Sequence, residues 1–125
     1  MENDRNKGNH VFADFINFYG NENLLGEYVY NLMIEAIERT PMKIMHKHLE
    51  ILNKDTPPGF SAFLCLDSSH ISAHSYTDIG LLAIDIFTCG STNTMDVMNY
   101  IKDNLSNKFP LIKCTYIDNH KRFNY

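Results

Sequence analysis

The sequence lacks the features that mark several large classes of protein. Acidic residues outnumber basic ones, 15 to 11, and no block of basic residues occurs, so we expect no nucleic-acid partner. No apolar run approaches the roughly 20 residues that a membrane span needs. Residues 1–7 are polar and partly acidic, unlike a secretion signal. These absences predict a protein that acts on neither nucleic acid nor membrane.

Cysteine is scarce as well. The chain has three cysteines, Cys65, Cys89 and Cys114, which is an odd number, and it has no Cys-x-x-Cys motif. Disulfide frameworks of secreted proteins use even numbers of cysteines, and many zinc or redox sites use the paired motif. The pattern therefore predicts reduced thiols and a cytoplasmic location.

The remaining composition is that of one ordinary globular domain. A chain of 125 residues can bury a single core but not two, so we predict one domain over residues 1–125. Hydrophobic residues make up 44% of the chain and charged residues 21%. Both fractions are close to the average for globular proteins.

Hydrophobic periodicity predicts the order β-α-β-β-β-α-β. A helix is expected to begin at Asn21 or Asn23, and a second helix within residues 91–94. The polar residues 118–125 are expected to be loose. The expected strands are residues 10–18, 42–52, 60–66, 81–88 and 110–117.

Few helices among many strands favour an α+β fold. We predict a two-layer α/β sandwich, in which an antiparallel sheet carries two helices on one face. The other face of the sheet would stay uncovered in so small a chain. An exposed sheet face predicts that two chains associate as a homodimer.

The segment 67–90 concentrates the residues that could carry chemistry. The pair Ser68–Ser69, taken alone, is typical of a turn between strands. His70 and His74, four residues apart, could share a metal ion if they were helical. They lie between expected strands without an evident third ligand, so we predict no metal site. Cys89 ends a strand, where loops commonly carry function.

Read in order, these residues resemble the self-processing site of prokaryotic-type S-adenosylmethionine decarboxylases. Those enzymes carry Glu-Ser-His-Ile-Ser-Ile-His-Thr-Trp-Pro-Glu and, further on, Asp-(apolar)-Phe-Thr-Cys-Gly. The present chain carries Ser68-Ser69-His70-Ile71-Ser72-Ala73-His74-Ser75-Tyr76-Thr77-Asp78 and Asp85-Ile86-Phe87-Thr88-Cys89-Gly90, with the same spacing. Gly8-Asn9-His10, Asp14 and Pro57-x-Gly59-x-Ser61 extend the resemblance over residues 8–106.

The resemblance implies a proenzyme that cuts its own backbone. The Ser69 hydroxyl would attack the Ser68 carbonyl to form an ester, and elimination followed by hydrolysis would leave a pyruvoyl group at Ser69. Residues 1–68 would become the beta chain and residues 69–125 the alpha chain. The pyruvoyl group would bind the substrate amine as a Schiff base and act as electron sink.

Three further roles follow from the same resemblance. His74 would be the base of self-processing, a task that suits an imidazole at neutral pH. Ser61 would assist this step. The Cys89 thiol would return a proton to the substrate carbon after carbon dioxide leaves, and a reference pKa near 8.5 keeps a thiol protonated at pH 7. The resemblance also implies a homodimer with the two sheets face to face.

The sequence departs from the family at three places. Ser68 replaces the Glu before the cleaved serine; cleavage needs a carbonyl rather than a side chain at that position, so we expect it to survive but to be slower. Tyr76 and Asp78 replace the Trp and Glu of the substrate site; they could still stack on adenine and hold a ribose hydroxyl. Asp55 stands where the family has an aromatic ring, a loss of about 1–3 kcal/mol of stacking unless Phe60 or Phe12 supplies the ring.

These departures leave three functions open. The first is decarboxylation of S-adenosylmethionine for spermidine synthesis, within polyamine biosynthesis. The second is a pyruvoyl-dependent L-ornithine or L-arginine decarboxylase, in which Asp55 or Asp78 pairs with the distal cation of the substrate. The third is an unprocessed, inactive homologue that regulates a partner enzyme. Retention of the four residues Ser61, Ser69, His74 and Cys89 weighs against the third.

Overall fold

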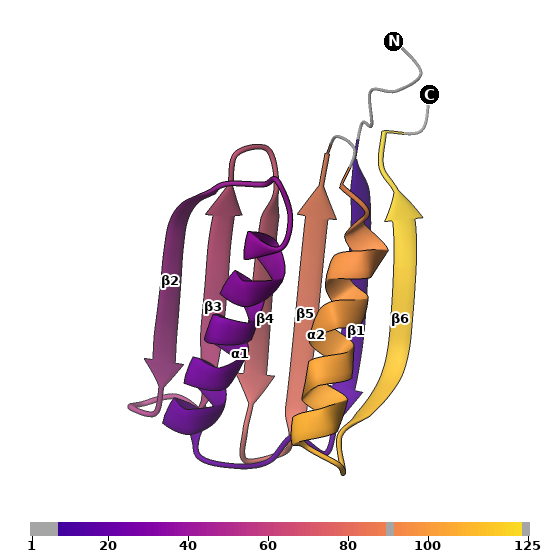
Figure 1. The fold of residues 1–125 in the computed structure, drawn as a ribbon. Coiled ribbons are helices and arrows are strands. Elements are labelled where there is room, and N and C mark those ends of the chain that lie inside the picture. Colours follow the sequence, from indigo (N-terminus) through magenta and orange to yellow (C-terminus); the bar gives the residue numbers. More distant parts are fainter. Residues whose placement is uncertain (1–7, 90–91, 124–125) are drawn as a thin grey trace, which may run out of the picture.

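The computed structural model describes residues 8–89 and 92–123. An antiparallel sheet of six strands carries two helices on one face (Figure 1). This confirms the predicted two-layer α+β sandwich. The elements are β1 (Asn9–Ile16), α1 (Glu22–Glu38), β2 (Ile44–Leu52), β3 (Gly59–Leu66), β4 (His70–Tyr76), β5 (Leu81–Thr88), α2 (Thr94–Lys108) and β6 (Lys113–Lys121).

The sheet has one strand more than the sequence predicted, because the serine-histidine segment itself forms β4. Along β4 the side chains of Ile71, Ala73 and Ser75 are buried, and those between them point to the opposite face. This alternation has the period of two that a strand requires. The expectation that both histidines lie between strands was therefore wrong. Because His70 and His74 lie within a strand, they do not have the helical i, i+4 arrangement that could share a metal ion.

The end of the chain was also predicted incorrectly. The last strand begins at Lys113 rather than at residue 110, and it continues to Lys121. Residues 118–121 pair with β1, so the expectation of a loose tail was wrong for them. Pro110 has no backbone N–H to donate and lies in the turn before the strand.

Both helices begin at asparagine caps. The Asn21 side chain accepts hydrogen bonds from the backbone N–H groups of Asn23 and Leu24, and the Asn93 side chain accepts one from Asp96. Each cap satisfies backbone donors that have no partner inside the helix. No helix in the described ranges is long and apolar enough to cross a membrane. The core between helices and sheet includes Val11, Phe15, Val29, Met33, Phe60, Leu64, Ile71, Ile84, Met98 and Ile101.

The strand order is β2-β3-β4-β5-β1-β6, with antiparallel neighbours throughout. Figure 1 shows four segments at the upper end of the sheet: the β3–β4 turn, the end of β5, the start of β1 and the end of β6. The β2–β3 loop and the β4–β5 turn lie at the lower end. Segments from both ends of the sequence thus meet beside the end of β5.

The face of the sheet opposite the helices has no covering layer among the described elements (Figure 1). We call this face the open face. It carries the strand residues that alternate with the buried ones, and several are polar or aromatic. From β1, β3, β4 and β5 these are His10, Phe12, Asp14, Ser61, Phe63, Cys65, His70, Ser72, His74, Tyr76, Ala83, Asp85 and Phe87.

Candidate active site

The Ser68–Ser69 peptide lies in the tight turn between β3 and β4, at the upper end of the sheet. The Ser69 carbonyl accepts a hydrogen bond from the backbone N–H of Leu66 at 2.9 Å, and the Asp67 carboxylate accepts one from the backbone N–H of Ser68 at 3.1 Å. Ser69 is only 8% exposed, whereas Ser68 is exposed. The turn therefore holds the peptide in a defined position with the Ser69 side chain turned inward.

Cys89 contacts both residues of this peptide. Its backbone N–H donates to the Ser69 hydroxyl oxygen at 3.2 Å, and its thiol donates to the Ser68 carbonyl oxygen at 2.9 Å. The sheet register explains the contact: Phe87 pairs with His70, so the residue two positions beyond Phe87 lies beside the turn that precedes His70. The predicted nucleophile, the predicted cleavage point and the predicted proton donor are thus brought together.

A second pair lies further down the open face. Ser61 and His74 are directly opposite each other in the β3–β4 ladder, and the Ser61 hydroxyl hydrogen-bonds to His74 Nδ1 at 2.9 Å. Residues directly opposite in antiparallel strands have neighbouring side chains on the same face. The sequence predicted that both residues act in processing, and the structure brings them together.

These two pairs do not meet within one chain. His74 is five residues along the chain from Ser69. Because a strand rises about 3.3 Å per residue, the backbones of Ser69 and His74 are about 16 Å apart. A proton transfer requires hydrogen-bond distance, directly or through one water. His74 therefore cannot act on the Ser69 of its own chain in this arrangement.

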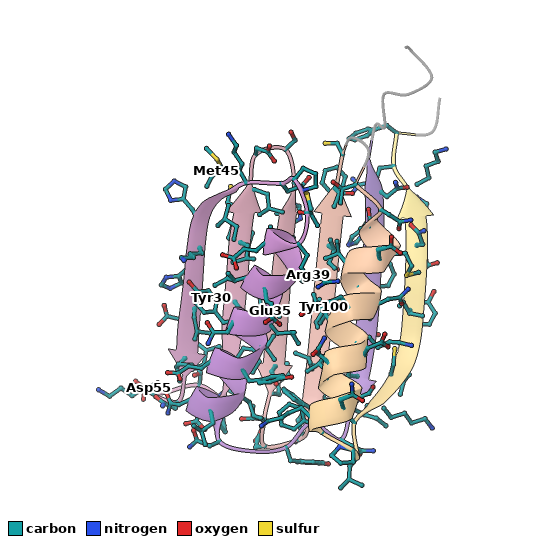
Figure 2. The ribbon with its side chains drawn as sticks, in the orientation of Figure 1. Tyr30, Glu35, Arg39, Met45, Asp55 and Tyr100 are labelled. Atoms are coloured by element: carbon teal, nitrogen blue, oxygen red, sulfur yellow. The ribbon has the colours of Figure 1, made fainter. Side chains whose placement is uncertain are left out.

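The predicted substrate-binding residues gather at the lower end of the sheet. Tyr76, at the end of β4, is half exposed, and Asp78 is exposed in the β4–β5 turn. Asp55 is exposed in the β2–β3 loop, which precedes Gly59, the pairing partner of Tyr76 (Figure 2). All three lie at the end opposite Ser69.

The two candidates for the missing aromatic ring have different environments. Phe60 is fully buried in the core between the sheet and the helices, so the suggestion that its ring replaces the missing one was wrong. Phe12 points to the open face, where its ring centroid lies 5.8 Å from that of Tyr116 and 5.1 Å from that of His10. Phe12 is the ring that remains available.

Some contacts on the open face were not foreseen. His10 Nε2 and the Asp85 carboxylate lie 3.0 Å apart across β1 and β5. The His70 ring stacks between Phe63 and Phe87, with centroids 6.2 and 5.6 Å away. Only the strand register creates these neighbours, so the sequence held no signal for them. Over residues 8–89 and 92–123 no group of three or more His, Cys, Asp or Glu side chains could hold a metal ion.

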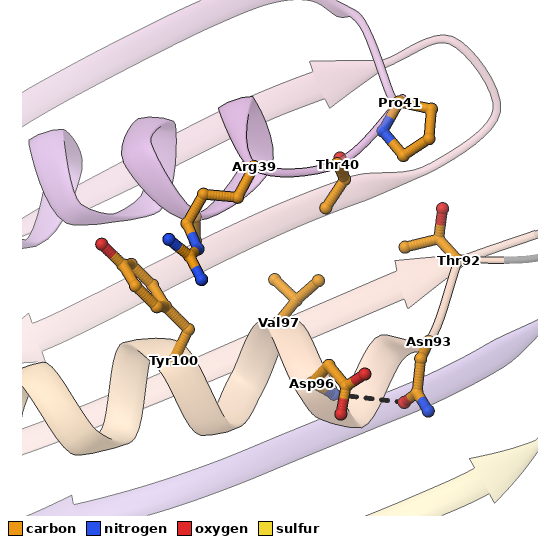
Figure 3. A pocket seen from close by; sticks show the side chains of 9 residues that line it. Arg39, Thr40, Pro41, Thr92, Asn93, Asp96, Val97 and Tyr100 are labelled. Carbon is orange, nitrogen blue, oxygen red and sulfur yellow. Dashed lines mark hydrogen bonds between the residues drawn. The ribbon is translucent and has the colours of Figure 1, made fainter.

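A cavity of about 350 Å³ lies elsewhere, between the end of α1 and the start of α2 (Figure 3). The Arg39 guanidinium lies 4.3 Å from the centre of the Tyr100 ring, and the Tyr100 hydroxyl donates to Glu35 at 2.8 Å. This hydrogen bond to a carboxylate raises the pKa of Tyr100 above 10.0. The residues that line this cavity include none of the predicted site residues.

Comparison with known proteins identifies the family of the chain. Residues 9–115 match the family model described as S-adenosylmethionine decarboxylase. A Clostridium tetani protein named S-adenosylmethionine decarboxylase proenzyme is 28% identical over 107 residues, covering 82% of this chain and 80% of that protein. A protein of the same name from Thermoanaerobacter sp. is 32% identical over 98 residues, covering 75% and 74%.

The fold has a solved counterpart. The crystal structure of the adenosylmethionine decarboxylase from Aquifex aeolicus superposes with a TM-score of 0.66 at 25% identity, covering 94% of this chain and 92% of that one. The family model, the named relatives and the fold agree with one another. The chain belongs to the S-adenosylmethionine decarboxylase family.

Proposed function

We propose that this protein is a proenzyme that cleaves itself between Ser68 and Ser69 and then decarboxylates S-adenosylmethionine for spermidine synthesis. The names of the relatives support this substrate. One observation carries the proposal: the Cys89 thiol holds the Ser68 carbonyl while the Cys89 backbone N–H holds the Ser69 hydroxyl. The three free cysteines fit a reducing compartment, which supports a cytoplasmic location.

The cleavage proceeds on the chain's own atoms. The Ser69 hydroxyl loses its proton to a base and attacks the Ser68 carbonyl carbon, which exchanges the amide for an ester and frees the Ser69 nitrogen. Elimination of the ester releases residues 1–68 as a chain that ends in a carboxylate. Hydrolysis of the remaining dehydroalanine releases ammonia and leaves a pyruvoyl group at the start of residues 69–125. A donor on the Ser68 carbonyl stabilises the negative charge that develops there during attack.

The residues around Ser69 fit the pyruvoyl group on which the family depends. Ser69 is nearly buried, and its backbone is fixed by Leu66. A group formed from its side chain would stay beside Cys89. The pyruvoyl group supplies the electron sink for loss of carbon dioxide. Cys89 then lies where a thiol proton can be given to the substrate carbon.

The separation of the two pairs supports a homodimer. If two open faces pack together about a two-fold axis, each Ser69 can lie opposite the partner's His74. The dimer then contains two equivalent sites. The open face exposes the side chains that such packing would bury, since Phe63 is 44%, Tyr76 50% and Tyr116 52% exposed. The same packing would bring Tyr76, Asp78 and Asp55 of one chain toward Ser69 of the other as substrate-binding residues.

The first test is an intact-mass spectrum of the purified protein under denaturing conditions. We expect two fragments that divide between residues 68 and 69, the second with a blocked, ketone-reactive N-terminus. Release of carbon dioxide is then measured with S-adenosylmethionine, and with L-ornithine and L-arginine as comparison substrates. A single uncut mass without release from any of the three would instead indicate an inactive regulator.

A further inference from the structure

Arg122 directly follows β6, whose end lies at the upper end of the sheet, as do the end of β5 and the β3–β4 turn (Figure 1). Its backbone N–H donates to the Gly8 carbonyl at 2.8 Å. Its guanidinium carbon lies 5.5 Å from the centre of the Phe87 ring and 5.6 Å from that of Phe123. Residue 122 lies beyond the segment 9–115 that the family model matches.

The sheet register directs this side chain toward the site. Asn9 pairs with Thr88 in β5 and with Lys121 in β6. One residue further, Gly8 therefore lies between Cys89 and Arg122. Neighbouring strands are about 4.8 Å apart, which puts the backbones of Cys89 and Arg122 about 10 Å apart. The Phe87 ring lies against Gly8 in this gap, and the Arg122 guanidinium carbon lies 5.5 Å from its centre.

Gly8 leaves room for the Phe87 ring between Cys89 and Arg122. A Cβ atom at this position would lie 2.7 Å from the Phe87 ring and 3.5 Å from Arg122 Cβ. Gly8 also has a φ of 137°, which other residues rarely adopt. The absence of a side chain at Gly8 thus allows Phe87 and Arg122 to approach each other over β1.

Among the described residues, no carboxylate forms an ion pair with Arg122. A guanidinium is always charged and matches a carboxylate with two parallel hydrogen bonds. An amino-acid substrate brings a carboxylate next to the carbon that reacts. We propose that Arg122 binds the α-carboxylate of the substrate beside Ser69 and Cys89, and so selects substrate over the decarboxylated product.

This inference rests on the proposed function, and it predicts a specific pattern of affinities. Loss of Arg122 should weaken binding of S-adenosylmethionine, which has the carboxylate, and leave binding of its decarboxylated product unchanged. For a hydrogen-bonded charge pair the expected weakening is about tenfold to a hundredfold. A merely structural role would weaken the binding of both molecules together.

The experiment compares Arg122→Ala, Arg122→Lys and the control Lys121→Ala. Lys121 is the exposed neighbour whose pairing partner, Asn9, lies one residue from Gly8. In the processed enzyme we measure KM for S-adenosylmethionine and the inhibition constant of the decarboxylated product. The same variants in the Ser69→Ala background, which cannot turn over, are titrated with both molecules by calorimetry.

We expect Arg122→Ala to raise KM about tenfold to a hundredfold with an unchanged product inhibition constant, and Arg122→Lys to recover part of the loss. Lys121→Ala should match wild type. An unchanged KM in Arg122→Ala, or equal shifts for substrate and product, would overturn the role of Arg122. If the wild-type chain is neither cleaved nor active, the proposed function itself fails, so the two failures are distinguishable.

Discussion

Ser69 lies in a turn with its side chain almost buried, whereas His74 lies on the open face in the middle of a regular strand. Ser69 pairs with Cys89, 20 positions further along the sequence, and the Cys89 backbone takes part in the contact. The second pair, Ser61 and His74, joins two side chains that face each other across an ordinary β ladder. The two regions thus differ both in burial and in how they are built.

The difference matches the tasks that we propose for them. A peptide that must be attacked by its own side chain needs a backbone geometry that a regular strand does not provide, and a turn can provide it. The proposed base, His74, needs a fixed side-chain orientation and an exposed position from which it can reach the partner chain. A rigid strand on the open face provides both. Neither region is sufficient alone, because about 16 Å of strand separates them.

The largest effect is expected from Ser69→Ala. Without the hydroxyl no ester can form, so the chain should stay whole and release no carbon dioxide. Ser68→Ala is the matched control, because it keeps the carbonyl that is attacked and should still be cleaved. Intact mass and a carbon dioxide assay measure both variants. Normal decarboxylation by Ser69→Ala would contradict the mechanism.

The next largest effect is expected from His74→Ala, which tests whether His74 of one chain acts on Ser69 of the other. His74→Ala should slow cleavage by about a hundredfold to ten-thousandfold, the range for a positioned base. Coexpression with Ser69→Ala should restore cleavage in mixed dimers, about half of the His74→Ala chains if subunits pair at random. Mass spectrometry counts the cut chains. No restoration in dimers shown to be mixed would mean that His74 acts within its own chain.

At the Ser69–Cys89 pair, Cys89→Ser separates the effect on cleavage from the effect on turnover. Serine keeps a donor for the Ser68 carbonyl, so the chain should still be cut. Turnover should fall by about a hundredfold, because the thiol that returns the proton is lost. Cut fragments are quantified by mass and turnover by carbon dioxide release. Cys65→Ser is the control, and full activity of Cys89→Ser would remove the thiol from this role.

The smallest effect concerns the helix layer, away from both regions. Tyr100→Phe removes the hydrogen bond to Glu35, so we expect a small drop in Tm with normal cleavage and turnover. The pKa of Tyr100 is raised on folding, so this stabilisation is present below pH 10 and is lost as pH rises through the higher value of the folded state. The Tm difference between wild type and Tyr100→Phe should therefore vanish at strongly alkaline pH. Tyr30→Phe, which loses no hydrogen bond among the described residues, is the control (Figure 2).

Much of the fold could be predicted from the sequence. Hydrophobic patterns identified most elements. α1 shows a stripe of apolar residues, and the strands show either alternation or a continuous apolar run, because burial on one face imposes a period. β4 was missed because, apart from Ile71 and Tyr76, it lacks the β-branched and aromatic residues that are enriched in strands. Burial of Ile71 and Ala73 under the helices outweighed this preference. The extension of β6 to Lys121 depends on pairing with β1, which lies more than a hundred residues earlier.

The sequence by itself determined the family and indicated Ser61, Ser69, His74 and Cys89 as candidate site residues, because order and spacing along the chain carry that information. Only the tertiary structure decided which of these residues meet. Pairing of β3 with β4 and of β4 with β5 brings Ser61 to His74 and Cys89 to Ser69, and strand length keeps the two pairs apart. The placement of Arg122 beside Gly8 and Phe87 likewise follows from the position of β1 between β5 and β6, which no local pattern encodes.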